Sequence, residues 1–407
     1  MKTLRETSHL DRTRETRIEG TAATVVIAAM IAALFAGSTM LTPLYVIYQD
    51  KFGFSQIGLT LIYAVYVVGN LAALLFFGGL SDAIGRRRTA VPAMAIAIVS
   101  SLMFLFAANT ASLYIGRILS GFAIGIGAGT GTAWLAELIG DKDKSRATII
   151  ATSTNFAGLG IGALGAGLLA EYAPWPLHLS FAVYLLALFA IGALIWITQD
   201  TGQPRARSIS SLSIRPRLSV PPDIRAQFIA PAVTGFGAMA LVGFYAALIP
   251  SILMHQLHDT NHAAAGLLVF ELAVVVAGVI VATQQLASRT AMLWALALMI
   301  PAVVLVVTAQ ILGSMTVMII ATAACGIAAG LGYRGSLQVV NQIAPDAQRA
   351  EVVSSYFVCC FSGNALPVIG IGVISTAASA TAASLVFAAM IIAFALVALV
   401  FGSRYTQ

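Results

Sequence analysis

Only 9% of the 407 residues are charged, whereas 59% are hydrophobic, and the net charge at pH 7 is +6. A soluble domain carries about a quarter charged residues, so this composition excludes a soluble protein and indicates an integral membrane protein. The cysteines lie within apolar stretches and form neither a disulfide framework nor a C-x-x-C metal site, so we expect no metal and no cofactor; they are Cys325, Cys359 and Cys360.

After a polar head at 1–20, twelve apolar runs follow one another. A helix needs about 20 apolar residues to cross the hydrocarbon core, and a single segment can satisfy its backbone groups there only as a helix. The first run is too long for the apolar part of a removable signal peptide. We therefore predict an all-α protein with transmembrane helices at about 22–47, 57–79, 90–108, 112–136, 147–170, 177–198, 227–254, 264–286, 291–312, 315–340, 350–374 and 381–402.

The placement of Lys and Arg predicts the orientation. If the head is cytoplasmic, nineteen of the twenty-two Lys and Arg residues fall in the head, the tail and the loops on the inner side. Lys51 alone falls outside, and Arg117 and Arg334 fall within spans. We therefore predict a multi-pass protein of the bacterial inner membrane with both termini in the cytoplasm. The basic charge marks the cytoplasmic face of the bilayer, so we expect no nucleic-acid partner.

The chain divides into two similar halves. A shift of 203 positions aligns Arg86 with Arg289 and Arg146 with Arg349, so the two sets of six runs resemble an internal repeat. A Ser-, Pro- and Arg-rich segment between them has the composition of a linker. We expect a cytoplasmic N-terminal segment at 1–20, a six-helix half at 21–198, a cytoplasmic linker at 199–226, a second six-helix half at 227–402 and a cytoplasmic tail at 403–407.

A short charged segment interrupts the first half between its second and third runs. Residues 78–88 read G-G-L-S-D-A-I-G-R-R-R, and the arginines hold this segment at a membrane surface. The sequence resembles the motif between the second and third helices of major facilitator superfamily transporters, with Ala83 where the family usually has a basic residue. The resemblance covers about 22–401. It implies twelve helices in two pseudo-symmetric halves that work by alternating access.

The same resemblance implies a conformational latch built from Gly78, Asp82, Gly85, Arg86 and Glu137. In the family, the matching charges form a network on the cytoplasmic side that holds the outward-open state, with the Asp near the start of the eleventh helix. A carboxylate is stabilised at a helix N-terminus, and an Arg between two acids can be held in one conformation and released in another. The alternative is that these charges only anchor the loop at the membrane surface.

Two charged residues within spans are candidates for proton coupling. Arg117 begins the pattern R-x-x-x-G in the fourth helix, which resembles a family pattern associated with coupling, although its side chain could instead reach the outer interface. Glu271 lies in the eighth helix among apolar residues, and such an environment disfavours the charged form of a carboxyl. Glu271 could therefore exchange protons, or it could be a permanently protonated packing residue.

Polar and aromatic residues within the spans are candidates for substrate binding. Arg334 lies in the tenth helix, which lines the central cavity in this fold, although its side chain could instead reach the cytoplasmic interface. Taken singly, the others are more often packing residues than ligand contacts. The candidates are Tyr45, Tyr63, Tyr66, Asn70, Asn155, Tyr245, Arg334, Gln338, Tyr356 and Asn364.

We interpret the chain as a secondary transporter of a small organic molecule that acts as a monomer in the bilayer. It has no G-x-x-x-x-G-K-[ST] phosphate loop and no cluster of His and acids in its spans, so we expect neither ATP hydrolysis nor another enzyme activity. A receptor or scaffold would need neither the charged motif nor the buried Arg and Glu.

Local sequence resemblances favour export. Residues 42–45 (T-P-L-Y) and 52–55 (F-G-F-S) resemble bacterial drug or metabolite exporters. The glycine-rich residues 158–167 resemble drug–proton antiporters, with Ala163 in place of a Pro. Proton-coupled export is therefore the leading interpretation. One alternative is uptake or exchange of an organic anion, which the positive charges of Arg117 and Arg334 suggest. The other alternative is uniport.

Overall fold

A computed structural model describes residues 17–140, 144–201 and 218–405, which are almost entirely helical. Twelve helices of this described part are long and apolar enough to cross a membrane, which confirms the predicted fold class. They are α1 (Gly20–Thr39), α3 (Gln56–Phe77), α5 (Arg86–Leu105), α6 (Thr110–Ile139), α7 (Lys144–Tyr172), α8 (Pro176–Ile197), α9 (Arg225–Gln256), α10 (His262–Ala282), α11 (Ser288–Leu312), α12 (Met315–Ile343), α13 (Arg349–Ala377) and α14 (Ala380–Tyr405).

Four shorter elements interrupt or precede these spans: α2 (Tyr45–Phe52), α4 (Leu80–Ile84), η3 (Pro222–Ile224) and η4 (Asp346–Gln348). Two of them change the predicted boundaries. The run expected at 22–47 ends as a helix at Thr39, and the chain turns through residues 40–44 before α2 begins at Tyr45. The charged segment also folds into α4, and Arg86 then begins α5.

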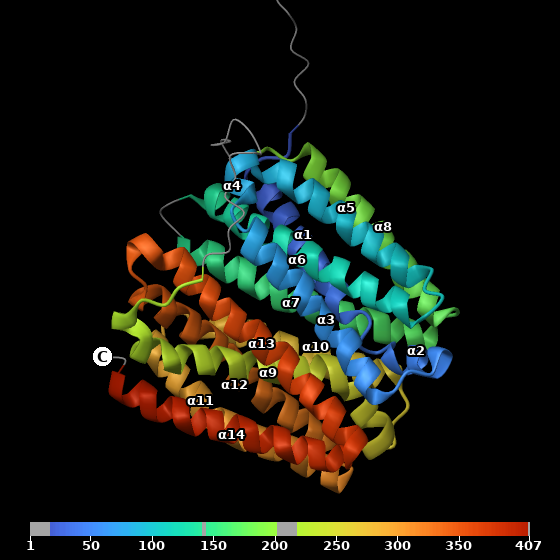
Figure 1. Cartoon of the computed structure of the whole chain (residues 1–407). Helices are drawn as coiled ribbons and strands as arrows, with labels where there is room; N and C mark the ends of the chain where they lie inside the picture. Colours follow the sequence, from blue (N-terminus) through green and yellow to red (C-terminus); the bar gives the residue numbers. More distant parts are fainter. Residues whose placement is uncertain (1–16, 141–143, 202–217, 406–407) are drawn as a thin grey trace, which may run out of the picture.

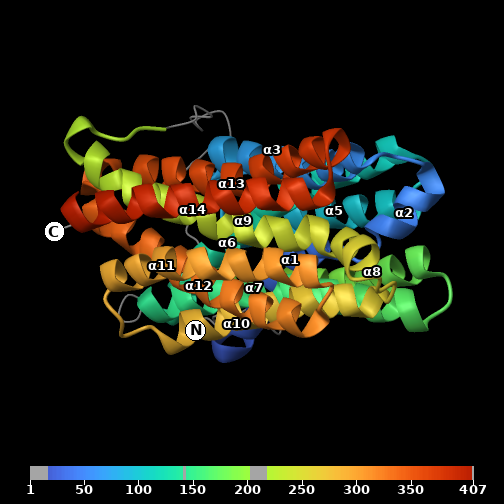
Figure 2. The ribbon, with the colours of Figure 1, turned by 90° about the horizontal axis from the view of Figure 1, so that it is seen from below.

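The long helices form two groups. Figure 1 shows α1 to α8 in the upper part of the view and α9 to α14 in the lower part, and Figure 2 shows the second group from below. The groups meet chiefly where α7 packs on α10 and where α3 packs on α13. Glycine makes the first contact close, because a Cβ at Gly266 would lie 2.5 Å from the backbone oxygen of Ala163. The second contact requires a glycine in the same way, because a Cβ at Gly372 would collide with Thr60 Oγ1.

The two ends of the bundle differ. We call the end that carries α4 the hinge end, and the end that carries α2 the far end (left and right in Figure 1). At the hinge end, Ile18 pairs with the strand-like segment after α8, donating to Ile197 O at 3.1 Å and accepting from Gln199 N at 3.0 Å. The C-terminal end of α14 lies at this end as well (Figure 1). Most of the predicted linker and of the N-terminal segment lies outside the described residues.

Candidate functional site

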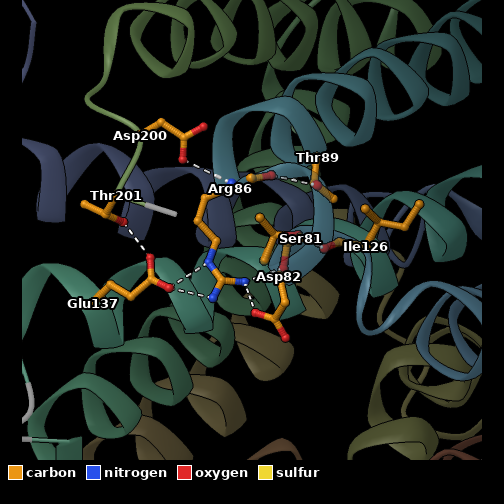
Figure 3. Close-up of polar contacts among 10 residues, drawn as sticks. Ser81, Asp82, Arg86, Thr89, Ile126, Glu137, Asp200 and Thr201 are labelled. Atoms are coloured by element: carbon orange, nitrogen blue, oxygen red, sulfur yellow. Dashed lines mark hydrogen bonds and ion pairs between the residues drawn. The ribbon is translucent and has the colours of Figure 1, made fainter. Parts of the chain in front are cut away.

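The hinge end contains a compact charge network around Arg86 (Figure 3). The guanidinium Nη2 lies 2.6 Å from Glu137 Oε1, and Nη1 lies 2.6 Å from Asp82 Oδ1. Nη1 also lies 2.6 Å from the hydroxyl of Ser81, to which it donates. The Arg86 side chain is only 8% exposed, whereas Asp82 is 56% exposed and Glu137 34%. These partners offset the cost of burying the guanidinium of Arg86. The structure thus brings together the three charged residues of the predicted network.

Two further residues join this network from the segment after α8. Asp200 accepts hydrogen bonds from the backbone N–H groups of Arg86 at 3.1 Å and Arg87 at 3.3 Å, and it thereby caps the N-terminus of α5. Thr201 donates to Glu137 Oε2 at 2.6 Å (Figure 3). Sequence reasoning missed both residues, because a helix cap supplied from more than a hundred positions away leaves no local pattern.

The two predicted hinge glycines have different roles. Gly85 has a φ of +105°, a conformation that residues with a Cβ rarely adopt, and a Cβ there would lie 3.0 Å from Asp200 Oδ2. Gly78 follows α3 with a φ of −56°, which any residue can adopt. The backbone conformation therefore requires glycine at Gly85, whereas close packing favours it at Gly78, because a Cβ there would lie 2.6 Å from the backbone oxygen of Leu74.

A cavity of about 50 Å³ lies between the two halves. Both halves contribute to its wall, and no Asp, Glu, Lys, Arg or His is among the described residues that line it. Most of the wall is aromatic or aliphatic, with a few hydroxyl and amide groups. The lining residues are Phe35, Ser38, Thr39, Tyr63, Tyr66, Asn155, Phe156, Leu159, Met239, Val242, Ala246, Tyr333, Phe357, Cys360, Phe361 and Asn364.

Arg117 lies directly behind this wall and is fully buried. Its Nη1 donates to Ser38 O at 2.5 Å, and its Nη2 donates to the hydroxyl of Tyr45. The centre of the guanidinium lies 5.4 Å from the ring of Tyr45, 5.7 Å from that of Tyr63 and 5.8 Å from that of Tyr66, within the range of cation–π attraction. Its Nε has no hydrogen-bond partner, and no ion pair to a carboxylate is found for it within the described residues.

Asn364 of α13 links this aromatic group to the second half. Its Oδ1 accepts hydrogen bonds from Tyr63 at 2.9 Å and Tyr66 at 2.7 Å, and its Nδ2 donates to Met239 O at 3.2 Å. Asn155 also lines the cavity, and its buried amide oxygen has no partner. Five of the predicted binding candidates thus lie in or behind one cavity wall: Tyr45, Tyr63, Tyr66, Asn155 and Asn364.

The remaining binding candidates lie away from this wall. Arg334 donates through Nη2 to the backbone oxygens of Gln284 and Leu286, each at 2.8 Å, and so fastens the loop between α10 and α11. Asn70 lies at the contact between α3 and α6, and Gln338 is half-buried in α12. The structure does not bring these three side chains to the cavity.

Two predicted tyrosines are buried within the second half. The hydroxyl of Tyr245 lies 3.1 Å from that of Thr322, and the hydroxyl of Tyr356 lies 2.7 Å from that of Ser336. Several cavity residues were not predicted individually, although aromatic residues within spans were the signal that could have found them. These are Phe156, Tyr333, Phe357 and Phe361.

Glu271 is half-buried in α10 and does not line the cavity. Its carboxyl is near enough to Tyr245 for an electrostatic interaction between them. The adjacent residue Phe270 packs against Gly160 of α7, so Glu271 lies on a helix that forms the contact between the halves. The structure does not bring Glu271 together with Arg117, whose partners are Ser38 and Tyr45.

The described part of the chain has twelve helices long and apolar enough to span a membrane, arranged in two groups with a cavity between them, as in the fold of secondary transporters. The sequence profile of the Major Facilitator Superfamily matches residues 27–368, so the chain belongs to this family of membrane transporters, which are not enzymes. The family suggested by the charged motif is thereby confirmed.

Curated relatives match only part of the chain. The multidrug resistance protein MdtL of Escherichia coli O45:K1 is 30% identical over 92 residues, 23% of this chain and 24% of that protein. MdtL of Shigella flexneri serotype 5b is 32% identical over 93 residues, with the same shares. The chain therefore matches about a quarter of the length of these relatives.

Solved structures match nearly the whole chain. A bacterial homologue of the human lysosomal transporter Spinster, in an inward-facing and unoccupied conformation, superposes with a TM-score of 0.70 at 15% identity, covering 93% of this chain and 95% of the other. The human organic anion transporter MFSD10 (TETRAN) superposes with a TM-score of 0.68 at 17% identity, covering 92% and 98%. At these identities the likeness shows the fold alone.

Proposed function

We propose that this protein exports a small organic molecule in exchange for protons by alternating access. The observation that carries the proposal is the cavity between the halves, whose polar bridge joins Tyr63 and Tyr66 of one half to Asn364 of the other. A substrate that displaces this bridge would interact with both halves at once. The partial likeness to multidrug resistance proteins and the motifs at 42–45 and 158–167 support export over uptake.

In this proposal the hinge end faces the cytoplasm of a bacterium, the protein lies in the inner membrane, and the monomer is the working unit. The far end then faces outward. Three hydrogen bonds join the halves towards the far end: Thr42 to Ala246 O at 2.6 Å, His262 N to Glu171 at 2.9 Å, and Ser251 to Gln56 at 3.5 Å. We assign these contacts to an inward-open state, because they hold the outer ends of the halves together.

The network around Arg86 is the proposed latch for the opposite, outward-open state. Its internal bonds lie within the first half and so can persist in both states. The half-exposed carboxylate of Asp82 is the part that can change partner between states. The N–H groups at the N-terminus of α13 are the donors that the family resemblance suggests for it. A carboxylate at a helix N-terminus is worth about 0.3–2 kcal/mol, which suits a contact that must form and break in each cycle.

Glu271 is the proposed proton carrier. It lies near the middle of α10, away from both helix ends, on a helix that packs against the first half. Its environment can therefore change as the halves move, and its affinity for a proton would change with it. Arg117 is assigned the second coupling role, since its charge lies behind the cavity without a carboxylate partner in the described part of the chain.

The experiment that tests this function uses purified protein in proteoliposomes with a pH-sensitive dye inside and a panel of small organic substrates. Export coupled to protons predicts substrate movement driven by a pH gradient. Glu271→Gln should abolish the gradient-driven movement but retain energy-independent exchange. If the variant still accumulates substrate against a gradient, with the pH dependence of the parent, then coupling lies elsewhere and uniport becomes the better interpretation.

Exchange of an organic anion is the second candidate, and the charge of Arg117 favours it. The described cavity wall carries no acid that could balance a cationic substrate, whereas a guanidinium lies directly behind Tyr63 and Tyr66. Ligand charge separates the two candidates. Binding of an anion should weaken in Arg117→Gln, whereas a lipophilic cation should depend on Glu271.

A further inference from the structure

A second cavity, which we call the far-end cavity, has a volume of about 280 Å³. It lies where the start of α3 meets the C-terminal parts of α9 and α13 and the start of α14. It shares no described lining residue with the central cavity. Gln56 belongs to the first half, and the other described lining residues belong to the second half. The far-end cavity is therefore a separate space to which both halves contribute.

The polar wall of the far-end cavity carries no Asp, Glu, Lys or Arg among the described residues. Such a wall recognises a ligand by hydrogen bonds, whereas an ion would need an opposite charge to offset its lost hydration. The wall therefore favours an uncharged polar ligand. Its groups are serine hydroxyls, glutamine amides and one imidazole, from Gln56, Ser251, His255, Gln256, Ser375 and Ser384.

Two of these groups are buried without a partner. Ser384 is only 3% exposed, and its hydroxyl makes no hydrogen bond within the described residues. Most buried hydroxyls in the described spans donate to a backbone oxygen, as Ser336 does to Gly332 O at 2.6 Å. The amide oxygen of Gln256 is also buried and has no partner there. A buried polar group without a partner costs free energy, so a ligand that supplies the missing hydrogen bonds gains affinity.

The other polar groups add both donors and acceptors. Nδ1 of His255 lies 2.9 Å from Ser251 O, and because a carbonyl oxygen only accepts, this nitrogen carries the hydrogen in the neutral ring. Nε2 then keeps a lone pair. The hydroxyl of Ser251 donates to Gln56 Oε1 at 3.5 Å, whereas the amide nitrogen of Gln56 has no partner in the described part of the chain. A hydroxyl group can donate and accept at once, so a ligand with several hydroxyls matches this mixture.

The remaining wall of the far-end cavity is aliphatic. Leu248, Ile252 and Ile371 line it, and each of them is buried. A sugar ring has C–H groups on its faces and hydroxyls around its edge, so it fits a wall that is partly aliphatic and partly hydrogen-bonding. The cavity volume lies just below the range of about 300–1,000 Å³ that is typical of sites for drug-sized ligands, and it therefore suits a single sugar ring.

We propose that the far-end cavity binds a small uncharged sugar, whose hydroxyls pair with Ser384, Gln256 and the polar groups around them. Because Gln56 comes from the first half, a bound sugar that also pairs with its amide would bridge the halves. It would then stabilise the state in which the far ends are together. The site lies outside the central cavity and does not depend on which substrate the protein moves.

Saturation-transfer NMR tests this site with the purified full-length protein in phosphatidylcholine nanodiscs free of sugar-based detergent. D-Glucose is the probe, and we expect saturable binding. Ser384→Ala and Gln256→Leu should each weaken binding about fivefold, the effect of losing one neutral hydrogen bond. Each removes a group that lacks a partner, so the fold should be retained. The matched control is Ser101→Ala, which removes another buried hydroxyl without a partner, in α5, and should leave binding unchanged.

Two further arms test the chemistry of the ligand and the location of its site. D-Glucuronate and D-glucosamine have the same ring with one charge and should bind more weakly than glucose. Asn155→Leu changes the central cavity and should leave glucose binding unchanged, which separates this proposal from the proposed transport function. Absence of glucose binding, equal binding of the charged sugars, an equal loss in Ser101→Ala, or a loss in Asn155→Leu would each overturn the proposal.

The bridge between the halves has its own measurement. Spin labels at Asp50→Cys and His258→Cys, both exposed at the far end, report the distance between the halves in a background without native cysteines. Saturating glucose should raise the share of shorter distances in the parent but not in Gln56→Ala. The same shift in both proteins, or no shift in the parent, would refute the bridge.

Discussion

Asp82→Asn is the sharpest test of the latch, because it keeps the shape of the side chain and removes its charge. In the conformation described, this carboxylate makes an ion pair with Arg86 at 2.6 Å, but it is 56% exposed. Exposed pairs contribute about 0.2–1 kcal/mol, so the folded protein should be destabilised only slightly. Arg86 also retains Glu137 and Ser81 as partners.

The effect on the conformational equilibrium should be larger. If Asp82 docks at the N-terminus of α13 when the hinge end closes, its loss removes about 0.3–2 kcal/mol from that state alone. The ratio of inward-open to outward-open protein should then rise about 2- to 30-fold. Transport should slow, since the cycle must pass through the weakened state, while insertion into the membrane is unchanged.

The measurement is a distance distribution between spin labels at Arg88→Cys and Gln348→Cys, both exposed at the hinge end, in a background without native cysteines. Asp82→Asn should shift the distribution towards the longer distances. Asp223→Asn is the control, because it removes an exposed carboxylate from the start of η3 outside the network. The same distribution in Asp82→Asn and in the parent would show that this carboxylate does not hold the closed state.

Three other predictions concern the contacts around the two sites. Asp200→Ala removes the cap of α5, which is worth about 0.5–2 kcal/mol. Amide hydrogen exchange in the first turn of α5 should then become severalfold faster, and an unchanged exchange rate would contradict the capping role. Asn364→Leu leaves the hydroxyls of Tyr63 and Tyr66 without their acceptor. Labelling of Cys360 in the cavity wall by a thiol reagent, measured by mass spectrometry, should then increase. Labelling at the parental rate would refute the role of Asn364 in joining the halves. His258→Cys should react with an impermeant reagent in intact cells whereas Ser403→Cys should not, and the reverse pattern would invert the proposed orientation.

Hydropathy made the helices predictable from the sequence, because every span must be apolar and helical in hydrocarbon. The hinge network was predictable in part, since Asp82 and Arg86 lie four residues apart and Glu137 lies in the last turn of a neighbouring span. The contribution of Asp200 was not, because it depends on where the chain returns after α8. The break near Pro43 was not predictable from the proline alone, because Pro250, Pro301 and Pro367 lie within continuous helices.

Arg117 and Arg334 show why the site was only partly predictable. Each is a single arginine among glycines and apolar residues within a span, so their sequence signals are alike. Arg117 lies behind the cavity among tyrosines, whereas Arg334 reaches backbone oxygens at the end of α10. The difference comes from the direction in which each helix face points and from the reach of a long side chain. The hydropathy pattern predicts neither the direction of the helix face nor the position that the side chain reaches, because these helices are apolar nearly all round.

The contacts at the two ends suggest how the transporter can keep its states close in energy. At the far end, Glu171 accepts from the backbone N–H of His262, at the N-terminus of α10. At the hinge end, the proposed docking of Asp82 at the start of α13 would use the same chemistry. Each contact sets one carboxylate against one helix N-terminus and is worth about 0.3–2 kcal/mol. Closing one end and opening the other would then exchange two interactions of similar strength, so that the binding energy of a small substrate or a single proton can decide the direction.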